Sequence, residues 1–126
     1  MFLRPDELDM PLTFEGARAS GLGLGSGVIM VFDDSIDIKA ILIRIAAFFR
    51  DESCGQCVPC RVGTVRQEEA LHRLIDGNDG GSDELALLAD LGLVMRDASI
   101  CGLGQTASSA ILSSIGRLGM FGGARP

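Results

Sequence analysis

The sequence has 126 residues and a formal net charge of −6 at pH 7; 47% of its residues are hydrophobic and 22% are charged. This balance predicts a globular domain rather than a disordered chain. The acidic charge and the absence of Trp and Tyr argue against a nucleic-acid partner, which requires a basic face and stacking aromatics. No apolar run reaches the roughly 18 residues of a membrane span, and the first residues lack a signal-peptide core, so we expect no membrane span and a cytoplasmic location.

The first 34 residues are predicted to form a loop and strand segment. The glycine-rich run 21–27 does not fit the dinucleotide-binding pattern G-x-G-x-x-G, because Ser26 or Val28 stands where the last glycine is needed. We interpret this run as a turn that precedes a buried strand over 28–32, since Val-Ile-Met-Val-Phe is a short run of residues that favour strands. The fold is therefore predicted to contain a short β segment at its N-terminus.

Residues 35–120 are predicted to form a small helical bundle, which makes the fold mainly α. The first helix is capped by Ser35 or Asp37 and runs to about residue 51, with a polar stripe so narrow that we expect burial on most sides. Three further helices are expected from the cysteine loop to about residue 75, from Ser82 to beyond Met95, and from near Thr106 to about Leu118. Residues 121–126 are expected to form a mobile tail.

The four cysteines carry most of the functional information. Cys54, Cys57 and Cys60 form a C-x2-C-x2-C run, and Cys101 follows much later in the chain. Three cysteines this close make a poor disulfide framework, and disulfides do not persist in a reducing cytoplasm. Three thiolates from one loop and one from elsewhere resemble the ligands of a [4Fe-4S] cluster. Structural zinc sites more often pair two C-x-x-C knuckles, so spacing favours the cluster over zinc without excluding zinc.

Two cysteine-containing blocks resemble a known family. The run 52–64 (ESCGQCVPCRVGT) and the run 99–107 (SICGLGQTA) are similar to the C-terminal iron–sulfur region of NADH-binding flavoprotein subunits. Such subunits occur in respiratory complex I, in NAD-linked formate dehydrogenases and in NAD-reducing hydrogenases. The resemblance implies that Cys54, Cys57, Cys60 and Cys101 bind one [4Fe-4S] cluster. It also implies that the strand over 28–32 is a remnant of a β-grasp-like region.

The resemblance implies an electron-transfer subunit or fragment. The family's domain for FMN and NADH is absent, so FMN and NAD(H) are expected only on a partner chain. The chain would relay electrons to or from that flavin and NAD(H) site within a multi-subunit oxidoreductase of the formate dehydrogenase, hydrogenase or NADH dehydrogenase type, and would not be catalytic alone. The alternative is a non-redox zinc or cluster module used for subunit assembly, which metal analysis would distinguish.

Six further residues are candidates for contacts around the cysteines: Arg50, Ser53, Gly55, Arg61, Gly102 and Gly104. The two arginines either favour the reduced state of a cluster through their charge or belong to surface ion pairs. The glycines after Cys101 are expected to let backbone N–H groups approach the cluster, since a Cβ there would crowd it. His72 is interpreted as solvent-facing rather than as a ligand. Glu68 and Glu69 are interpreted as part of a solvated face.

Overall fold

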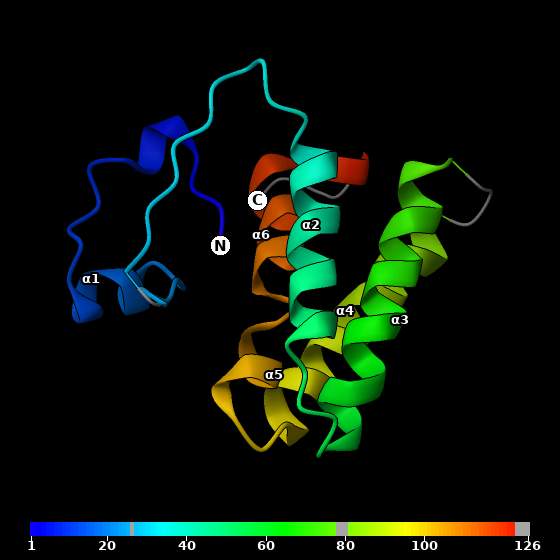
Figure 1. Cartoon of the computed structure of the whole chain (residues 1–126). Helices are drawn as coiled ribbons and strands as arrows, with labels where there is room; N and C mark the ends of the chain where they lie inside the picture. Colours follow the sequence, from blue (N-terminus) through cyan, green and yellow to red (C-terminus); the bar gives the residue numbers. More distant parts are fainter. Residues whose placement is uncertain (26, 78–80, 123–126) are drawn as a thin grey trace.

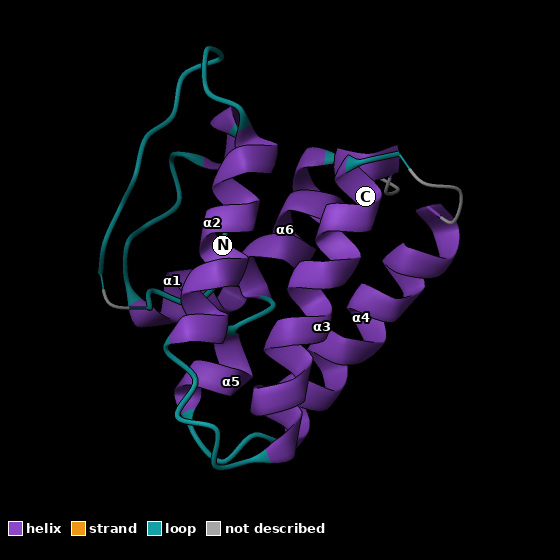
Figure 2. Cartoon of the chain, turned by 45° about the vertical axis from the view of Figure 1, so that its right-hand side comes forward, coloured by secondary structure: helices purple, strands orange, loops and turns teal. Residues whose placement is uncertain are grey.

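The computed structural model describes residues 1–25, 27–77 and 81–122. Within them the chain is helical and contains no β-strand, which confirms the mainly α fold class (Figures 1 and 2). The elements are, in chain order, η1 (Pro5–Glu7), α1 (Phe14–Ala19), α2 (Ile38–Asp51), α3 (Val58–Ile75), α4 (Gly81–Ala98), α5 (Gly102–Thr106), α6 (Ser109–Leu118) and η2 (Met120–Gly122).

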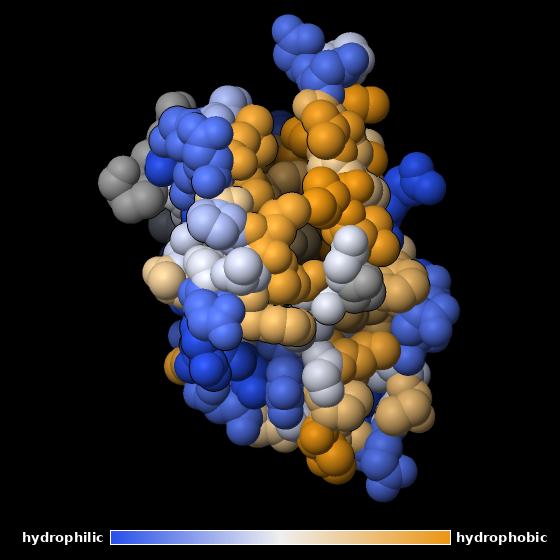
Figure 3. All heavy atoms as spheres, turned by 90° about the vertical axis from the view of Figure 1, so that its left-hand side faces the viewer, coloured by the Kyte–Doolittle hydropathy of each residue, from blue (hydrophilic) through white to orange (hydrophobic). Residues whose placement is uncertain are grey.

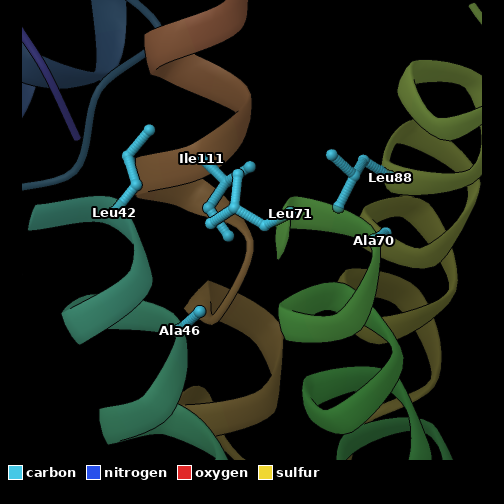
Figure 4. Packing of buried hydrophobic residues seen from close by; sticks show 6 residues of the cluster. All are labelled: Leu42, Ala46, Ala70, Leu71, Leu88 and Ile111. Atoms are coloured by element: carbon cyan, nitrogen blue, oxygen red, sulfur yellow. The ribbon is translucent and has the colours of Figure 1, made fainter. Parts of the chain in front are cut away.

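The bundle is built from α2 to α6. Helix α3 packs against both α2 and α4, while α6 contacts α2 and α4, and the short α5 lies against α3 and α4. One core joins four of these helices, as Figure 4 shows; its buried members are Leu42, Ala46, Ala70, Leu71, Leu88 and Ile111. Burying these apolar side chains is the main favourable term holding the helices together. The core therefore fixes α2, α3, α4 and α6 relative to one another, and α5 is positioned by its contacts with α3 and α4.

Helix α2 begins where the sequence predicts. Asp37 is its N-cap, and the Asp37 carboxylate accepts a hydrogen bond from the Lys39 N–H at 2.9 Å. Its burial is less complete than expected, because only Leu42 and Ala46 are buried and the Phe48 side chain stays 55% exposed. The rest of the described chain therefore covers only part of the apolar face of α2.

The predicted strand over 28–32 is wrong. These residues form no strand, and Val28 to Val31 are exposed rather than buried. The residue types favour extended backbone, but a strand needs a neighbouring strand, and the described part of the chain contains none. The segment instead runs as an extended trace outside the bundle, between α1 and α2 (Figure 1).

Two helical features of the structure were not expected. A short helix, α1, lies in the predicted loop region, and its N-cap Thr13 accepts a hydrogen bond from the Gly16 N–H at 3.0 Å. The predicted fourth helix corresponds to α6, and a further short helix, α5, precedes it in the stretch expected to be the loop after Cys101.

Two expected loop regions are only partly described. Of the connection expected between the helix that ends near residue 75 and the helix that starts at Ser82, residues 78–80 lie outside the described part of the chain. Of the predicted tail, 123–126 also lie outside it, whereas Phe121 belongs to η2 and packs against the core.

None of the described helices is both long and apolar enough to cross a membrane. This finding agrees with the expectation from the sequence, which contains no apolar run of sufficient length.

Candidate functional site

The two cysteine segments lie at the same end of the bundle. The loop that carries Cys54 and Cys57 connects α2 to α3, and Cys101 precedes α5; both connections are at the lower end of the molecule in Figures 1 and 2. Cys57 is the N-cap of α3 and Cys101 is the N-cap of α5. The Cys101 side chain makes no capping hydrogen bond. Both cysteines thus stand at helix starts, where unpaired N–H groups favour negative charge.

Cys57 links the two segments directly. The backbone N–H of Ile100, and next the N–H of Cys60, hold the pKa of the Cys57 thiol below its ordinary value. Hydrogen bonds of this kind favour the thiolate, which is the form that binds metals. Ile100 immediately precedes Cys101, and Gly104 of α5 packs against Cys60, so the fourth cysteine's segment lies next to the C-x2-C-x2-C run.

Cys60 is the buried member of the set. Its Sγ lies 3.3 Å from the Ser53 Oγ, and its backbone follows Pro59 in the first turn of α3. Gly104 of α5 packs against it closely: a Cβ on Gly104 would lie 2.4 Å from the Ser99 Oγ and 2.9 Å from the Cys60 Cβ. Only glycine permits this approach of α5 to α3. Gly102 differs, because nothing lies within 4 Å of a Cβ built there.

The cysteine loop is held in shape by its own residues. Gly55 has a φ of +74°, which glycine adopts without strain. Its carbonyl oxygen accepts a hydrogen bond from the Arg61 Nη1 at 2.9 Å, and its N–H donates to the Ser53 Oγ at 3.4 Å. The positive charge of Arg61 therefore lies against the loop that carries Cys54 and Cys57.

The Arg50 guanidinium pairs with two carboxylates of its own chain. Its Nη1 lies 2.7 and 2.5 Å from the two Glu68 carboxylate oxygens, and its Nε donates to Asp51 at 3.0 Å. The interpretation of Glu68 as part of a solvated face is wrong, since only 8% of this residue is exposed. Arg50 lies 18 residues before Glu68, on α2, so the periodicity of α3 could not indicate that these two side chains pair. His72 is exposed, as expected.

The four thiols are not arranged around a single ion. Cys54 and Cys101 are exposed and Cys57 is partly buried. In the described ranges, no three His, Cys, Asp or Glu side chains stand close enough together to hold one metal ion. A cubane differs from a single ion because each of its four irons takes one thiolate, so its ligands enclose a larger group. Four thiols at one end of the bundle match such a group in the number and kind of ligands that it takes.

A family model matches most of the chain. Residues 40–118 match the model described as the NADH-ubiquinone oxidoreductase-F iron-sulfur binding region. The chain belongs to this family. The match covers α2 to α6 and all four cysteines, so the resemblance of the two cysteine blocks is confirmed, as is the class of cofactor expected from them: an iron–sulfur cluster.

Individual relatives agree with the family. The chain is 35% identical over 113 residues to an NADH-quinone oxidoreductase subunit of Mycobacterium tuberculosis (strain ATCC 25618 / H37Rv), and this match covers 90% of the chain and 25% of the relative. It is 35% identical over 109 residues to the NADP-reducing hydrogenase subunit HndC of Solidesulfovibrio fructosivorans, covering 86% of this chain and 22% of that protein.

The same likeness extends to a solved structure. An NAD+-reducing [NiFe]-hydrogenase in the H2-reduced state superposes with a TM-score of 0.77 and 32% identity, covering 98% of this chain and 21% of that one. The chain therefore spans about a quarter of the length of the curated relatives it matches.

Proposed function

We propose that the chain carries one [4Fe-4S] cluster on Cys54, Cys57, Cys60 and Cys101 and relays electrons within a multi-subunit, NAD(H)-linked oxidoreductase. The observation that carries the proposal is the approach of the Cys101 segment to the C-x2-C-x2-C run, through the Ile100 N–H near Cys57 and through Gly104 against Cys60. When bound, such a cluster exchanges one electron and binds no substrate.

The chain's own residues would hold and tune that group. The cysteines supply the thiolates, two of them at helix starts where the N–H groups favour negative charge. The Ser53 hydroxyl can donate to the Cys60 sulfur, and Arg61 brings positive charge to the loop. Hydrogen bonds and charge of this kind favour the reduced, more negative state.

The flavin and NAD(H) sites are assigned to a partner chain. The described residues contain no glycine-rich strand–turn–helix unit, and the run 21–25 precedes an extended segment rather than a helix. The relatives are subunits named for NADH-quinone oxidoreductase and NADP-reducing hydrogenase activities. We therefore assign the described residues the relay step, between a flavin or NAD(H) site that lies outside them and further clusters.

Metal analysis of the full chain purified under argon tests the proposal. We expect about four irons and four sulfides per chain and an absorbance band near 400 nm that bleaches when the protein is reduced. A colourless protein with one tightly bound zinc per chain would instead establish the structural module for subunit assembly. Iron without sulfide would contradict both assignments.

A further inference from the structure

One buried hydroxyl at the cysteine end of the bundle has no hydrogen-bond partner in the chain. Figure 3 shows hydrophilic side chains around the rim of one face of the molecule, where water can pair with their polar atoms. Buried polar atoms lack that alternative, and most of them are hydrogen-bonded within the protein. Among the described residues, the buried side-chain nitrogen and oxygen atoms without a partner are Arg4 Nε, Gln67 Oε1 and Ser99 Oγ.

The side chains of Arg4 and Gln67 have other polar contacts, whereas that of Ser99 has none. Arg4 Nε lies 3.3 Å from an Asp6 carboxylate oxygen in an ion pair. The Gln67 Nε2 donates to the Ala107 carbonyl at 3.3 Å. The hydroxyl is the only polar group of the Ser99 side chain, and this residue is only 6% exposed. A buried hydroxyl without a partner is unfavourable, so an acceptor for it is expected.

Hydrogen bonds on both sides hold the Ser99 backbone in place. Its N–H donates to the Met95 carbonyl of α4 at 3.2 Å, and its carbonyl accepts from the Gln105 Nε2 of α5 at 3.0 Å. Ser99 stands two residues before Cys101 in the sequence. Its hydroxyl is therefore fixed in the connection between α4 and α5, which carries the fourth cysteine.

The Ser99 hydroxyl lies beside the part of the site that Cys57 and Cys60 supply. A Cβ built on Gly104 would lie 2.4 Å from the Ser99 Oγ and 2.9 Å from the Cys60 Cβ, so both atoms flank the same point. The Ile100 N–H contributes most to the lowered pKa of the Cys57 thiol, and the Ser99 side chain contributes as well. The acceptors that this end of the bundle offers to the hydroxyl are therefore sulfur atoms.

We infer that the Ser99 hydroxyl donates a hydrogen bond to a sulfur atom of the cluster site, on the side of Cys57 and Cys60, and thereby favours the reduced state. The inference rests on the proposed function, because the sulfur atoms become more negative only when a cluster held there is reduced. A donor stabilises that added charge. Ser53, whose Oγ lies 3.3 Å from the Cys60 Sγ, offers a hydroxyl from the other cysteine segment. Each of the two segments thus contributes one hydroxyl to the sulfur atoms.

Redox titration of Ser99→Ala in the full chain, purified under argon, tests the inference. At the midpoint potential of the wild type, we expect the ratio of reduced to oxidised cluster to fall about threefold to tenfold, which is the effect of one lost hydrogen bond. Ser99→Thr keeps the hydroxyl and should restore the ratio. Ser114→Ala is the matched control and should leave the ratio unchanged, because Ser114 is also buried but its hydroxyl donates to the Ile111 carbonyl at 2.7 Å.

Resonance Raman spectra separate a hydrogen bond to sulfur from a change in packing. The iron–sulfur stretching bands of the wild type should shift when deuterium oxide replaces water, and this shift should be smaller in Ser99→Ala and restored in Ser99→Thr. An unchanged ratio or deuterium shift in Ser99→Ala, an equal fall in Ser114→Ala, or no recovery in Ser99→Thr would overturn the inference. Loss of iron from Ser99→Ala would also overturn it, since a hydroxyl that only tunes the cluster is not needed to hold it. A wild type without iron and sulfide would instead contradict the proposed function.

Discussion

At the scale of single residues, the packing around the cysteines depends on where glycine stands beside them. Gly104 and Gly102 both follow Cys101, and the sequence suggests the same role for each. The structure separates them: a Cβ on Gly104 would overlap Ser99 and Cys60, whereas Gly102 faces open space. Gly104 is therefore needed to pack α5 on α3, and a Cβ there would meet the chain itself.

Gly104→Ala should destabilise the fold and reduce cluster occupancy. The added Cβ would displace Ser99 or Cys60, at a cost of about 1–3 kcal/mol for an overpacked site. Gly102→Ala is the matched control and should leave both properties nearly unchanged. Denaturant unfolding and iron content measure the two effects. Equal behaviour of the two variants would show that the close approach at Gly104 is not required.

Arg61→Gln should lower the reduction potential of the bound cluster by about tens of millivolts. The reason is the loss of positive charge from a side chain that donates to the Gly55 carbonyl in the cysteine loop. Arg66→Gln is the control, because Arg66 carries the same charge further along α3, where it pairs with Glu69. A redox titration followed by electron paramagnetic resonance compares them. Identical potentials in the wild type and Arg61→Gln would place Arg61 outside the electrostatic reach of the cluster.

At the scale of elements, ion pairs join α3 to α2 and to α4. Arg50 of α2 pairs with Glu68, and Arg73 pairs with Glu84 of α4 at 2.6 and 2.8 Å. The hydrogen bond from Arg73 holds the pKa of Glu84 below its ordinary value, while partial burial opposes this shift. Helix α3 supplies Cys60, so its position decides where the thiol lies.

The contribution of Glu84 predicts a pH dependence of stability. Because its pKa is lower in the folded state, the stabilisation is present above the unfolded value of about 4.3 and is lost as the pH falls through the folded value. Glu84→Gln should therefore lower the melting temperature at neutral pH, with the difference from wild type shrinking below about pH 4. Glu69→Gln, which removes an exposed pair with Arg66, should have a smaller effect. A difference that stays constant with pH would exclude this ion pair as the cause.

Local signals in the sequence were sufficient for the long helices. The N-cap at Asp37 and the apolar periodicity of 38–51 and 58–75 correspond to α2 and α3. The strand over 28–32 was wrong because residue types describe a preference for extended backbone but not the presence of a neighbouring strand. The six-residue helix α1 was missed because it is too short for periodicity, although Thr13 is a recognisable cap.

Tertiary contacts of the site could be predicted only in part. The cysteine spacing indicated which residues to consider, and the structure places the Arg61 guanidinium against the Gly55 carbonyl of the cysteine loop. The pairing of Arg50 with buried Glu68 and the contact of Gly104 with Ser99 join residues on different elements or in different turns. Such contacts depend on how the helices pack, which the sequence pattern of one helix does not contain.

At the scale of the whole molecule, two parts of the chain carry different features. The cysteines lie at one end of a helical bundle whose core is buried among α2, α3, α4 and α6. Residues 28–32 run outside that bundle and pair with no strand in the described residues.

The most direct test of the central claim is the electron paramagnetic resonance spectrum of Cys101→Ala, recorded beside the wild type after anaerobic purification. Cys101 is the one proposed ligand outside the C-x2-C-x2-C run, and it reaches the site through the start of α5. We expect the reduced wild type to show one [4Fe-4S] signal, and the variant to show a [3Fe-4S] signal or no cluster, because one iron loses its thiolate. An intact, reducible [4Fe-4S] signal in Cys101→Ala would remove Cys101 from the ligands and contradict the proposed site.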